Sequence, residues 1–152
     1  MALLPVLHVL SAVLWVGGMF FAHQVLRPVA AGLLEPPVRL RLWLKVFDRF
    51  FPWVQAAVIV LAVTGAWMIV RLGGLGRVGW YVHAMLTLAL AMFAIFGYVQ
   101  HRLLRALRGA VDNGDWPAGG AVLGRIRRLV GINLLLGLVT VAVASGGRHF
   151  AH

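Results

Sequence analysis

Two histidines stand at matching positions in otherwise apolar segments of this sequence. His8 lies about one helical turn into the first apolar segment, and His83 lies about one turn into the third. Ionisable side chains within a membrane are costly and are therefore candidates for a functional site. Neutral imidazole is a common axial ligand of haem iron, and the rest of a b-type haem needs only an apolar slot. The pair therefore predicts a haem site between two helices, with hydrogen bonding between the helices as the alternative.

A second pair of histidines, His23 and His101, stands near the opposite ends of the same two segments. At about 100° per residue, His83 and His101 share one helix face, whereas His8 and His23 differ by about 60°. A cofactor between the first and third helices is therefore geometrically allowed in either leaflet. Both residues of this second pair have polar or basic neighbours, so simple interfacial histidines are the alternative.

Copper is the rival to haem as a partner of these imidazoles. Thioether sulfur together with imidazole suits Cu(I). Met68, near the end of the second apolar segment, should lie at roughly the depth of His8 and His83. The chain has no cysteine, which excludes thiolate metal sites, cysteine nucleophiles and disulfides. A metal site of His8, His83 and Met68 is the resulting copper hypothesis.

The first apolar segment also carries Trp15 and the adjacent glycines Gly17 and Gly18. Paired glycines in a membrane helix often mark close helix packing, and they also let a macrocycle approach the backbone. Trp15 is expected in the wall of such a pocket. We therefore include all three residues among the candidate cofactor-binding positions, with helix packing as the alternative.

The composition indicates that membrane helices position these residues. The 152-residue chain is 62% hydrophobic and only 12% charged, whereas an average soluble domain is about 25% charged. Uncharged apolar runs occur at 3–26, 50–70, 78–100 and 129–147. Each is long enough to cross a hydrocarbon core about 30 Å thick. We expect one all-α domain over residues 1–152, an integral membrane bundle of four transmembrane helices.

The basic residues predict how this bundle crosses the membrane. Of the 14 Lys and Arg residues, five lie in the connection 27–49 and six in the connection 101–128. The positive-inside rule then places both connections in the cytoplasm and both termini in the periplasm, across a bacterial inner membrane. The net charge of +10 is read as a topology signal with attraction to anionic lipid headgroups, and not as a sign of nucleic-acid binding.

The two long connections have different expected structures. The first should contain an interfacial helix leading into the second span, because Pro36 and Pro37 suit a helix start and Leu40, Leu44 and Phe47 share one face. In the second, residues 113–120 (NGDWPAGG) form a turn cluster that should reverse the chain before the last span.

The residues around His8 resemble a family signature. His8, Trp15, Gly17, Gly18 and Phe20 resemble the first-helix pattern H-x6-W-x-G-G-x-F of CopD-like membrane proteins. The segments GWYVHAM at 79–85 and RIRRLVGINLLLGLVTVAVA at 125–144 are also similar to small members of that family, so the likeness covers most of the chain. The family is named for copper resistance, and the resemblance implies a copper-related role.

A more distant resemblance is to HemJ, the membrane protoporphyrinogen oxidase. Its first-helix histidine precedes a W-x-x-G-x-F pattern and ligates haem, and the corresponding residue here is His8. HemJ also has a functional lysine early in its third span. This chain has Met85 or His83 in that region and no lysine in any span. The resemblance therefore implies haem binding at His8, with a departure at the residue linked to oxidase activity.

Together these features predict an inner-membrane protein with a metal centre at His8 and His83. Haem b would serve membrane redox chemistry or electron transfer, and copper would serve transport or homeostasis. A protoporphyrinogen oxidase is the enzyme alternative, and a structural or assembly subunit without a cofactor is the other. The expected partners are the lipid bilayer, the haem or copper ion, and either further copies of the chain or a redox partner.

Overall fold

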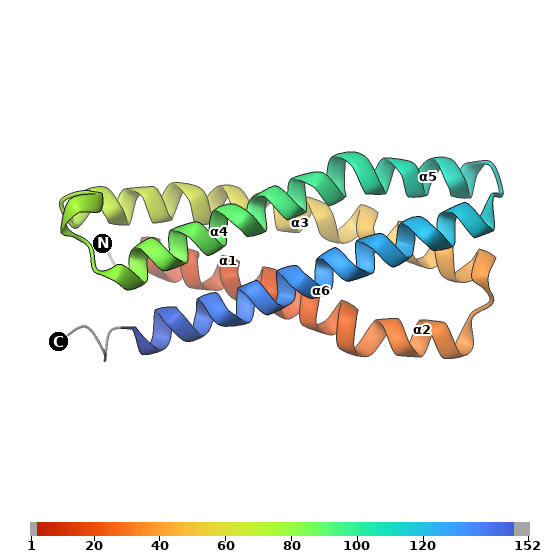
Figure 1. Ribbon diagram of the computed structural model, residues 1–152, viewed down its shortest axis with the longest axis horizontal. Helices are drawn as coiled ribbons and strands as arrows, with labels where there is room; N and C mark the ends of the chain where they lie inside the picture. The colour runs from red at the N-terminus through yellow and green to blue at the C-terminus, as the bar shows by residue number, and fades with distance from the viewer. Residues whose placement is uncertain (1–2, 148–152) are drawn as a thin grey trace.

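Four long antiparallel helices form the protein in a computed structural model that describes residues 3–147 (Figure 1). The first comprises α1 (Leu3–Phe20), the π-helical turn η1 (Phe21–Leu26) and α2 (Arg27–Leu33), and the second is α3 (Pro36–Arg71), followed by the short 3-10 helix η2 (Leu75–Arg77). The third comprises α4 (Trp80–Tyr98), the π-helical turn η3 (Val99–Leu103) and α5 (Leu104–Asp112), and the fourth is α6 (Trp116–Gly146). Each of the four is long and apolar enough to cross a membrane, which confirms the predicted all-α, four-span fold.

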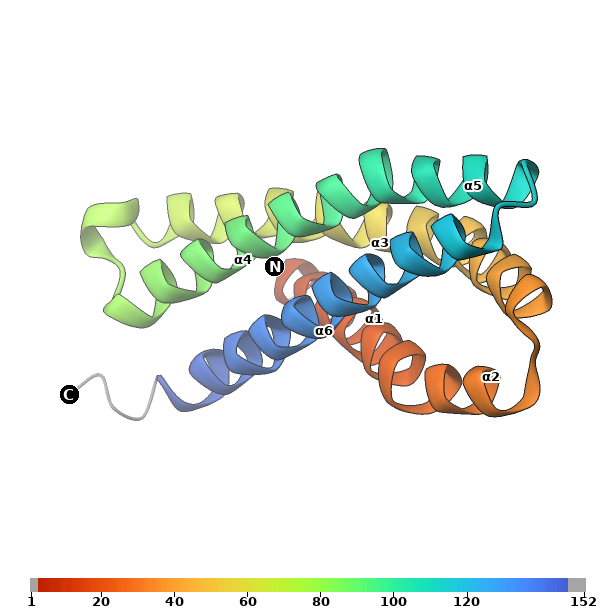
Figure 2. The ribbon, with the colours of Figure 1, turned by 45° about the vertical axis from the view of Figure 1, so that its right-hand side comes forward.

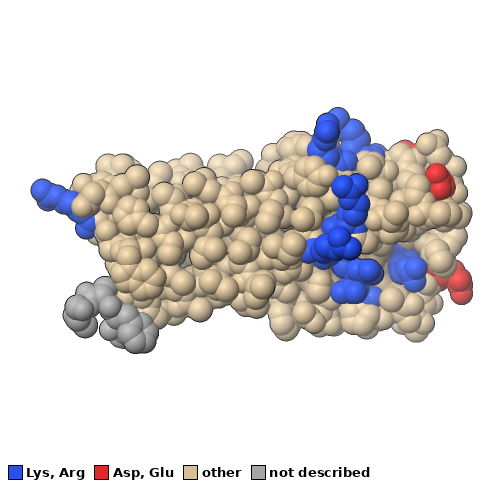
Figure 3. Space-filling model, in the orientation of Figure 1, with Lys and Arg blue, Asp and Glu red and all other residues tan. Residues whose placement is uncertain are grey.

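The two ends of the bundle differ in charge. We call one the basic end; it carries α2, the start of α3, α5 and the start of α6 (Figures 1 and 2). The opposite end, which we call the terminal end, carries the start of α1, the turn between α3 and α4, and the end of α6. Figure 3 shows a band of Lys and Arg at the basic end and a long surface without charged residues between this band and the terminal end.

Prolines, glycines and one aspartate set the boundaries of the helices. α3 begins at Pro36, where the missing N–H of proline costs no helical hydrogen bond. Asp115 caps α6 by accepting a hydrogen bond from the N–H of Ala118 at 3.1 Å. Gly73 and Gly74 have φ angles of 93° and 87°. Other residues rarely adopt these left-handed conformations, so the glycines allow the chain to reverse after α3.

The connections at 27–49 and 101–128 are mostly helical, and the long helices of the bundle run through them. The reversals at this end use only residues 34–35 and 113–115, so most of the predicted turn cluster 113–120 is the first turn of α6. The segment 36–49, expected as a separate interfacial helix, is helical but continues into the second span without a break. Its apolar face, with Leu40 and Phe47, is buried within the bundle and not on a membrane surface.

The helices are longer than a membrane span requires, and at the basic end they bury each other's apolar faces. Leu40 of α3, Leu107 of α5 and Ile126 of α6 are 1%, 0% and 1% exposed, and they belong to one apolar cluster. Three neighbouring helices thus exclude water from a face that would otherwise need lipid. At about 1.5 Å per residue, the 36 residues of α3 span about 54 Å, well beyond a hydrocarbon core of about 30 Å.

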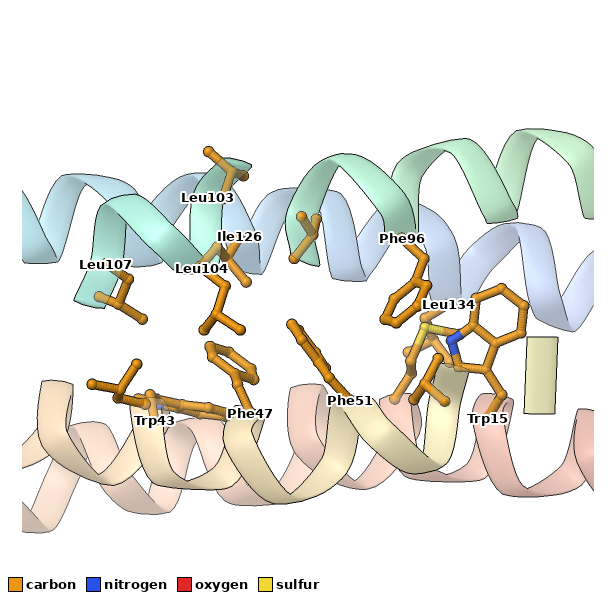
Figure 4. Close-up of a cluster of buried hydrophobic side chains, with 14 of the residues drawn as sticks. Trp15, Trp43, Phe47, Phe51, Phe96, Leu103, Leu104, Leu107, Ile126 and Leu134 are labelled. Atoms are coloured by element: carbon orange, nitrogen blue, oxygen red, sulfur yellow. The ribbon is translucent and has the colours of Figure 1, made fainter. Parts of the chain in front are cut away.

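A chain of aromatic rings continues this core into the membrane-spanning part (Figure 4). On α3, Trp43, Phe47 and Phe51 follow one another at one-turn spacing, with ring centroids 5.4 Å and 5.0 Å apart. Phe51 meets Phe96 of α4 edge-on at 5.4 Å, and Phe96 meets Trp15 of α1 at 6.0 Å. Such contacts contribute about 0.5–1.5 kcal/mol each beyond the burial of area. The extension and the spans therefore share one core.

The outer surface of the spans is apolar. Val13, Val63 and Leu135 are 61%, 62% and 62% exposed, and many other large apolar side chains are similarly exposed. Such a surface is unfavourable in water, whereas lipid is a suitable environment for it provided that every backbone group is bonded within a helix. The exterior therefore agrees with four membrane spans.

Leu107→Ala should lower the stability of the folded protein by about 2–5 kcal/mol, because it leaves a void where three helices meet. Leu33→Ala removes the same atoms from a side chain that is 78% exposed at the same end, and it should change stability by no more than about 0.5 kcal/mol. Thermal unfolding of the detergent-purified protein, followed by circular dichroism, measures both. Equal effects would contradict a packed extension.

Candidate functional site

His8 is held by a hydrogen bond across the interface between α1 and α3. Its Nδ1 lies 2.7 Å from the Oγ1 of Thr64, and the Thr64 hydroxyl donates its own hydrogen to the carbonyl of Val60 at 2.6 Å. A hydroxyl has one hydrogen, so Thr64 Oγ1 must accept from His8, and the Nδ1 of His8 is the protonated ring nitrogen. Thr64 is only 3% exposed. We refer to His8, Thr64 and the Val60 carbonyl as the His8 relay.

The His8 relay leaves Nε2 as the basic nitrogen of a neutral imidazole. Metal-binding histidines commonly donate their other ring N–H to a neighbouring acceptor, which fixes the tautomer and the orientation of the ring. Gly65 faces the same ring, since a Cβ at this position would lie 3.4 Å from the Cε1 of His8. The adjacent Thr64 and Gly65 therefore orient the imidazole and give it room.

The sequence patterns assign no role to Thr64 in this site. The one local feature that could have indicated it is a hydroxyl residue followed by glycine within an apolar span, because the small neighbour leaves space for a ring beside the hydroxyl. The depth of His8 is readable from its position in the first span. Its partner depends on how α1 and α3 are rotated relative to each other.

Met68 and His83, the other predicted metal ligands, lie in different environments. Met68 follows Thr64 by four residues, so the two share one face of α3, and Met68 is partly buried. The side chain of His83 is exposed on α4. α1 packs mainly against α3, and α4 packs mainly against α6. The pairing of His8 with His83 therefore stays a prediction. Within residues 3–147, no group of three His, Cys, Asp or Glu side chains is placed to hold a metal.

Trp15 and Gly18 lie where helices pack closely. Trp15 is 3% exposed and stacks on Phe93 of α4 with 5.9 Å between ring centroids. A Cβ at Gly18 would overlap the ring of Phe50 on α3, so any larger residue here would push this ring aside. Gly17 is exposed, and a Cβ there would have no neighbour within 4 Å. A contribution of these three residues to cofactor binding stays a prediction.

Two of the long helices contain a π-helical turn, and each turn carries a histidine. His23 lies in η1 and His101 lies in η3. Backbone hydrogen bonds in these turns join residues five apart, as between the N–H of Arg27 and the carbonyl of Ala22. Such a turn shifts the face of the residues that follow it. The expected common face of His83 and His101 assumes a regular helix, which η3 interrupts.

His23 lies against α6 at a glycine. A Cβ at Gly131 would lie 2.8 Å from the Nε2 of His23, so a larger residue would displace the ring. The Nδ1 of His23 is buried and has no hydrogen-bond partner within residues 3–147. His101, by contrast, is exposed. Cofactor binding by His23 and His101 stays a prediction.

Thr64→Val keeps the shape of the side chain but removes the acceptor of the His8 Nδ1–H. We expect the imidazole to change from the Nδ1–H form to a mixture with the Nε2–H form. Long-range nitrogen–proton NMR spectra of labelled histidine measure this change. Thr64→Ser retains the hydroxyl and is the matched control, which should preserve the Nδ1–H form. Unchanged His8 spectra in the valine variant would contradict the relay.

A comparison with known protein families identifies the family of the chain. The family model described as copper resistance protein D, CopD, matches residues 44–146, which is more than half of the chain. No curated protein and no solved structure matches the chain. The matched region contains Thr64, Met68 and His83 and begins after His8. With four helices that can cross a membrane and a family match over most of its length, the chain belongs to the CopD family of multi-pass membrane proteins.

Proposed function

We propose that this CopD-family protein binds copper(I) near the terminal end of the bundle, with the Nε2 of His8 as a ligand. The observation that carries the proposal is the His8 relay, which orients the ring and leaves Nε2 basic. The description of the family as copper resistance protein D supports copper as the metal. The proposed role is the handling of copper at the membrane, in transport or homeostasis.

Met68 is the second ligand in this proposal. It lies one helical turn beyond Thr64 on the same face of α3, and an unbranched thioether side chain adapts readily to a nearby metal. Imidazole nitrogen and thioether sulfur are the donor types that Cu(I) accepts. His83, exposed on α4 at the same end of the bundle, is the third candidate donor.

A haem b held between His8 and His83 is the redox alternative, and the contacts favour it less. Such a clamp needs both imidazoles on one slot, whereas His8 faces α3 and the His83 side chain is exposed. If the purified protein shows a Soret band that His8→Ala abolishes, haem replaces copper as the proposed cofactor. Electron transfer and protoporphyrinogen oxidation then become the candidate functions. Absence of both haem and copper would leave the structural or assembly role.

We also infer that the basic end lies in the cytoplasm and the terminal end in the periplasm of a bacterial inner membrane. The band of Lys and Arg at the basic end supports this orientation through the positive-inside rule (Figure 3). The proposed copper ligands would then face the periplasmic side.

His8→Ala should weaken Cu(I) binding by about tenfold or more, since a tenfold change corresponds to only about 1.4 kcal/mol from one lost donor. Titration of the purified protein with Cu(I) against a coloured chelator gives the stoichiometry and the affinity. His101→Ala, at an exposed histidine away from the relay, is the matched control and should leave the affinity unchanged. Equal copper binding by wild type and His8→Ala would contradict the proposal.

Met68→Leu should weaken copper binding in the same titration, because leucine fills a similar volume but has no sulfur. Met19→Leu is its matched control, since Met19 is a buried core residue at 3% exposure and should leave the affinity unchanged. If both methionine variants bind copper as tightly as wild type, Met68 is not a ligand.

Alkaline phosphatase is active only in the periplasm, so fusions to it test the proposed orientation. A fusion after Gly147 should be active and a fusion after Asn113 should be inactive, because these positions lie at opposite ends of the bundle. The reverse pattern of activity would show that the orientation is wrong.

A further inference from the structure

A cavity of about 220 Å³ lies at the basic end, between the first helix, the start of α3 and the first half of α6. Arg27, Arg39 and Arg127 line it from these three helices, together with His23. No acidic side chain is among the lining residues that the structure describes. In the sequence these arginines indicate only the membrane topology. The fold brings them together at one concave site.

The arginines of the cavity act on one another as like charges. Arg127 is repelled by Arg27 and Arg39, and the one ion pair within residues 3–147 lies elsewhere, between Asp48 and Arg108. A concave site lined by charge of one sign focuses the field and attracts ions of the opposite sign. The cavity is therefore electrostatically suited to an anion.

The π-helical turn η1 brings Arg27 into the cavity. Ala22, His23 and Arg27 all line it, although residues 22 and 27 would lie about 140° apart on a regular helix. The hydrogen bond from the Arg27 N–H to the Ala22 carbonyl closes a five-residue turn that brings the two positions toward one face. Pro28 follows directly and has no N–H for the usual helical bond to Gln24, which favours the wider turn. Turns of this kind are frequent at functional sites.

The remaining lining adds one polar group and a largely apolar wall. The buried Nδ1 of His23 lacks a hydrogen-bond partner among the described residues, and buried nitrogen atoms in proteins are normally satisfied. Leu40, Trp43 and Trp116 contribute apolar and aromatic surface. The complementary ligand therefore has a small anionic head and an adjoining apolar body.

The cavity begins at the level where the apolar runs end and extends from there toward the start of α3 and the start of α6. Arg27 directly follows the first apolar run, and Arg127 stands two residues before the last one begins. The band of Lys and Arg in Figure 3 marks the same boundary. A ligand at this depth is reached from the headgroup layer of the bilayer as well as from water.

We propose that the cavity binds the phosphate group of an anionic phospholipid from the adjacent leaflet. Arg27, Arg39 and Arg127 contact the phosphate, because planar guanidinium groups donate paired hydrogen bonds to phosphate oxygens. The aromatic lining contacts the glycerol and the first methylene groups. Basic pockets between membrane helices bind such headgroups, and the site is separate from the copper ligands proposed at the terminal end.

Native mass spectrometry of the full-length, delipidated protein in detergent tests this proposal, with phosphatidylglycerol and phosphatidylcholine as probes. We expect one phosphatidylglycerol to bind per chain, and phosphatidylcholine to bind at least tenfold more weakly. Arg127→Gln should weaken phosphatidylglycerol binding by about tenfold or more. Arg125→Gln removes the same charge two residues earlier on α6, outside the cavity. It should change binding by no more than about twofold, because Arg125, unlike Arg127, does not line the cavity.

A second variant separates the shape of the cavity from its charge. Gly124 lines the cavity, and a Cβ there would have no neighbour within 4 Å. Gly124→Leu therefore fills the space and keeps every charge, and leucine is a better helix former than glycine. We expect it to weaken phosphatidylglycerol binding by about tenfold or more while thermal unfolding shows a folded protein.

Inorganic phosphate, titrated against bound phosphatidylglycerol, distinguishes a lipid from a soluble anion. We expect it to displace the lipid only weakly, because it has no apolar body. Inorganic phosphate that competes as tightly as the lipid would overturn the lipid assignment. Equal binding of the two lipids, equal losses in Arg125→Gln and Arg127→Gln, or normal binding by Gly124→Leu would overturn the site itself.

Discussion

Close contact with α6 is the constraint on which the rest of the structure depends. Lipid-facing helices gain little from the hydrophobic effect when they associate within a bilayer, so dense packing must hold them together. α6 contacts each of the other three long helices. A Cβ at Gly119 would lie 2.9 Å from Leu40 of α3, and a Cβ at Gly137 would lie 2.8 Å from Val16 of α1. At these glycines the side chains of neighbouring helices thus pack directly against the backbone of α6.

Both candidate sites inherit their geometry from this packing. With α1 and α3 placed against α6, Thr64 is within hydrogen-bonding distance of His8, and Gly65 leaves space for the ring. At the basic end the first half of α6 forms one wall of the arginine-lined cavity. The two sites lie at opposite ends of the bundle and involve different chemistry, one with a basic nitrogen for a soft metal and the other with guanidinium groups for an anion.

The sequence predicts the spans well because lipid imposes a simple requirement, a long apolar run without charge. At the basic end, each apolar run ends near the first charged residue, whereas the helix itself continues beyond that residue. Amphipathic segments such as α5 continue because one face, with Leu104 and Leu107, is buried by neighbouring helices. That contact involves residues far apart in the chain, and no local pattern contains it. The boundary at Pro36 is the exception, since it follows from local backbone chemistry.

The sites are predictable only in part, for two physical reasons. The depth of a side chain in the membrane follows from its position along a helix, so the sequence identifies His8 as an imidazole within the membrane. Its bond to Thr64 depends on the rotation of two helices about their axes, which one sequence does not specify. The cavity depends on a π-helical turn, and angular estimates at about 100° per residue assume that no such turn exists. Pro28 is the local sign that the first helix is irregular there.

The continuity of α3 has a mechanical consequence. Arg39 of the cavity and Thr64 of the His8 relay stand on one unbroken helix, about 38 Å apart at a rise of about 1.5 Å per residue. Pro52 lies near the midpoint between them and removes one backbone hydrogen bond, so it is where this rod bends or pivots most easily. The two halves of α3 are thus joined at the weakest point of its backbone. A bend there changes the angle between the half that carries Arg39 and the half that carries Thr64.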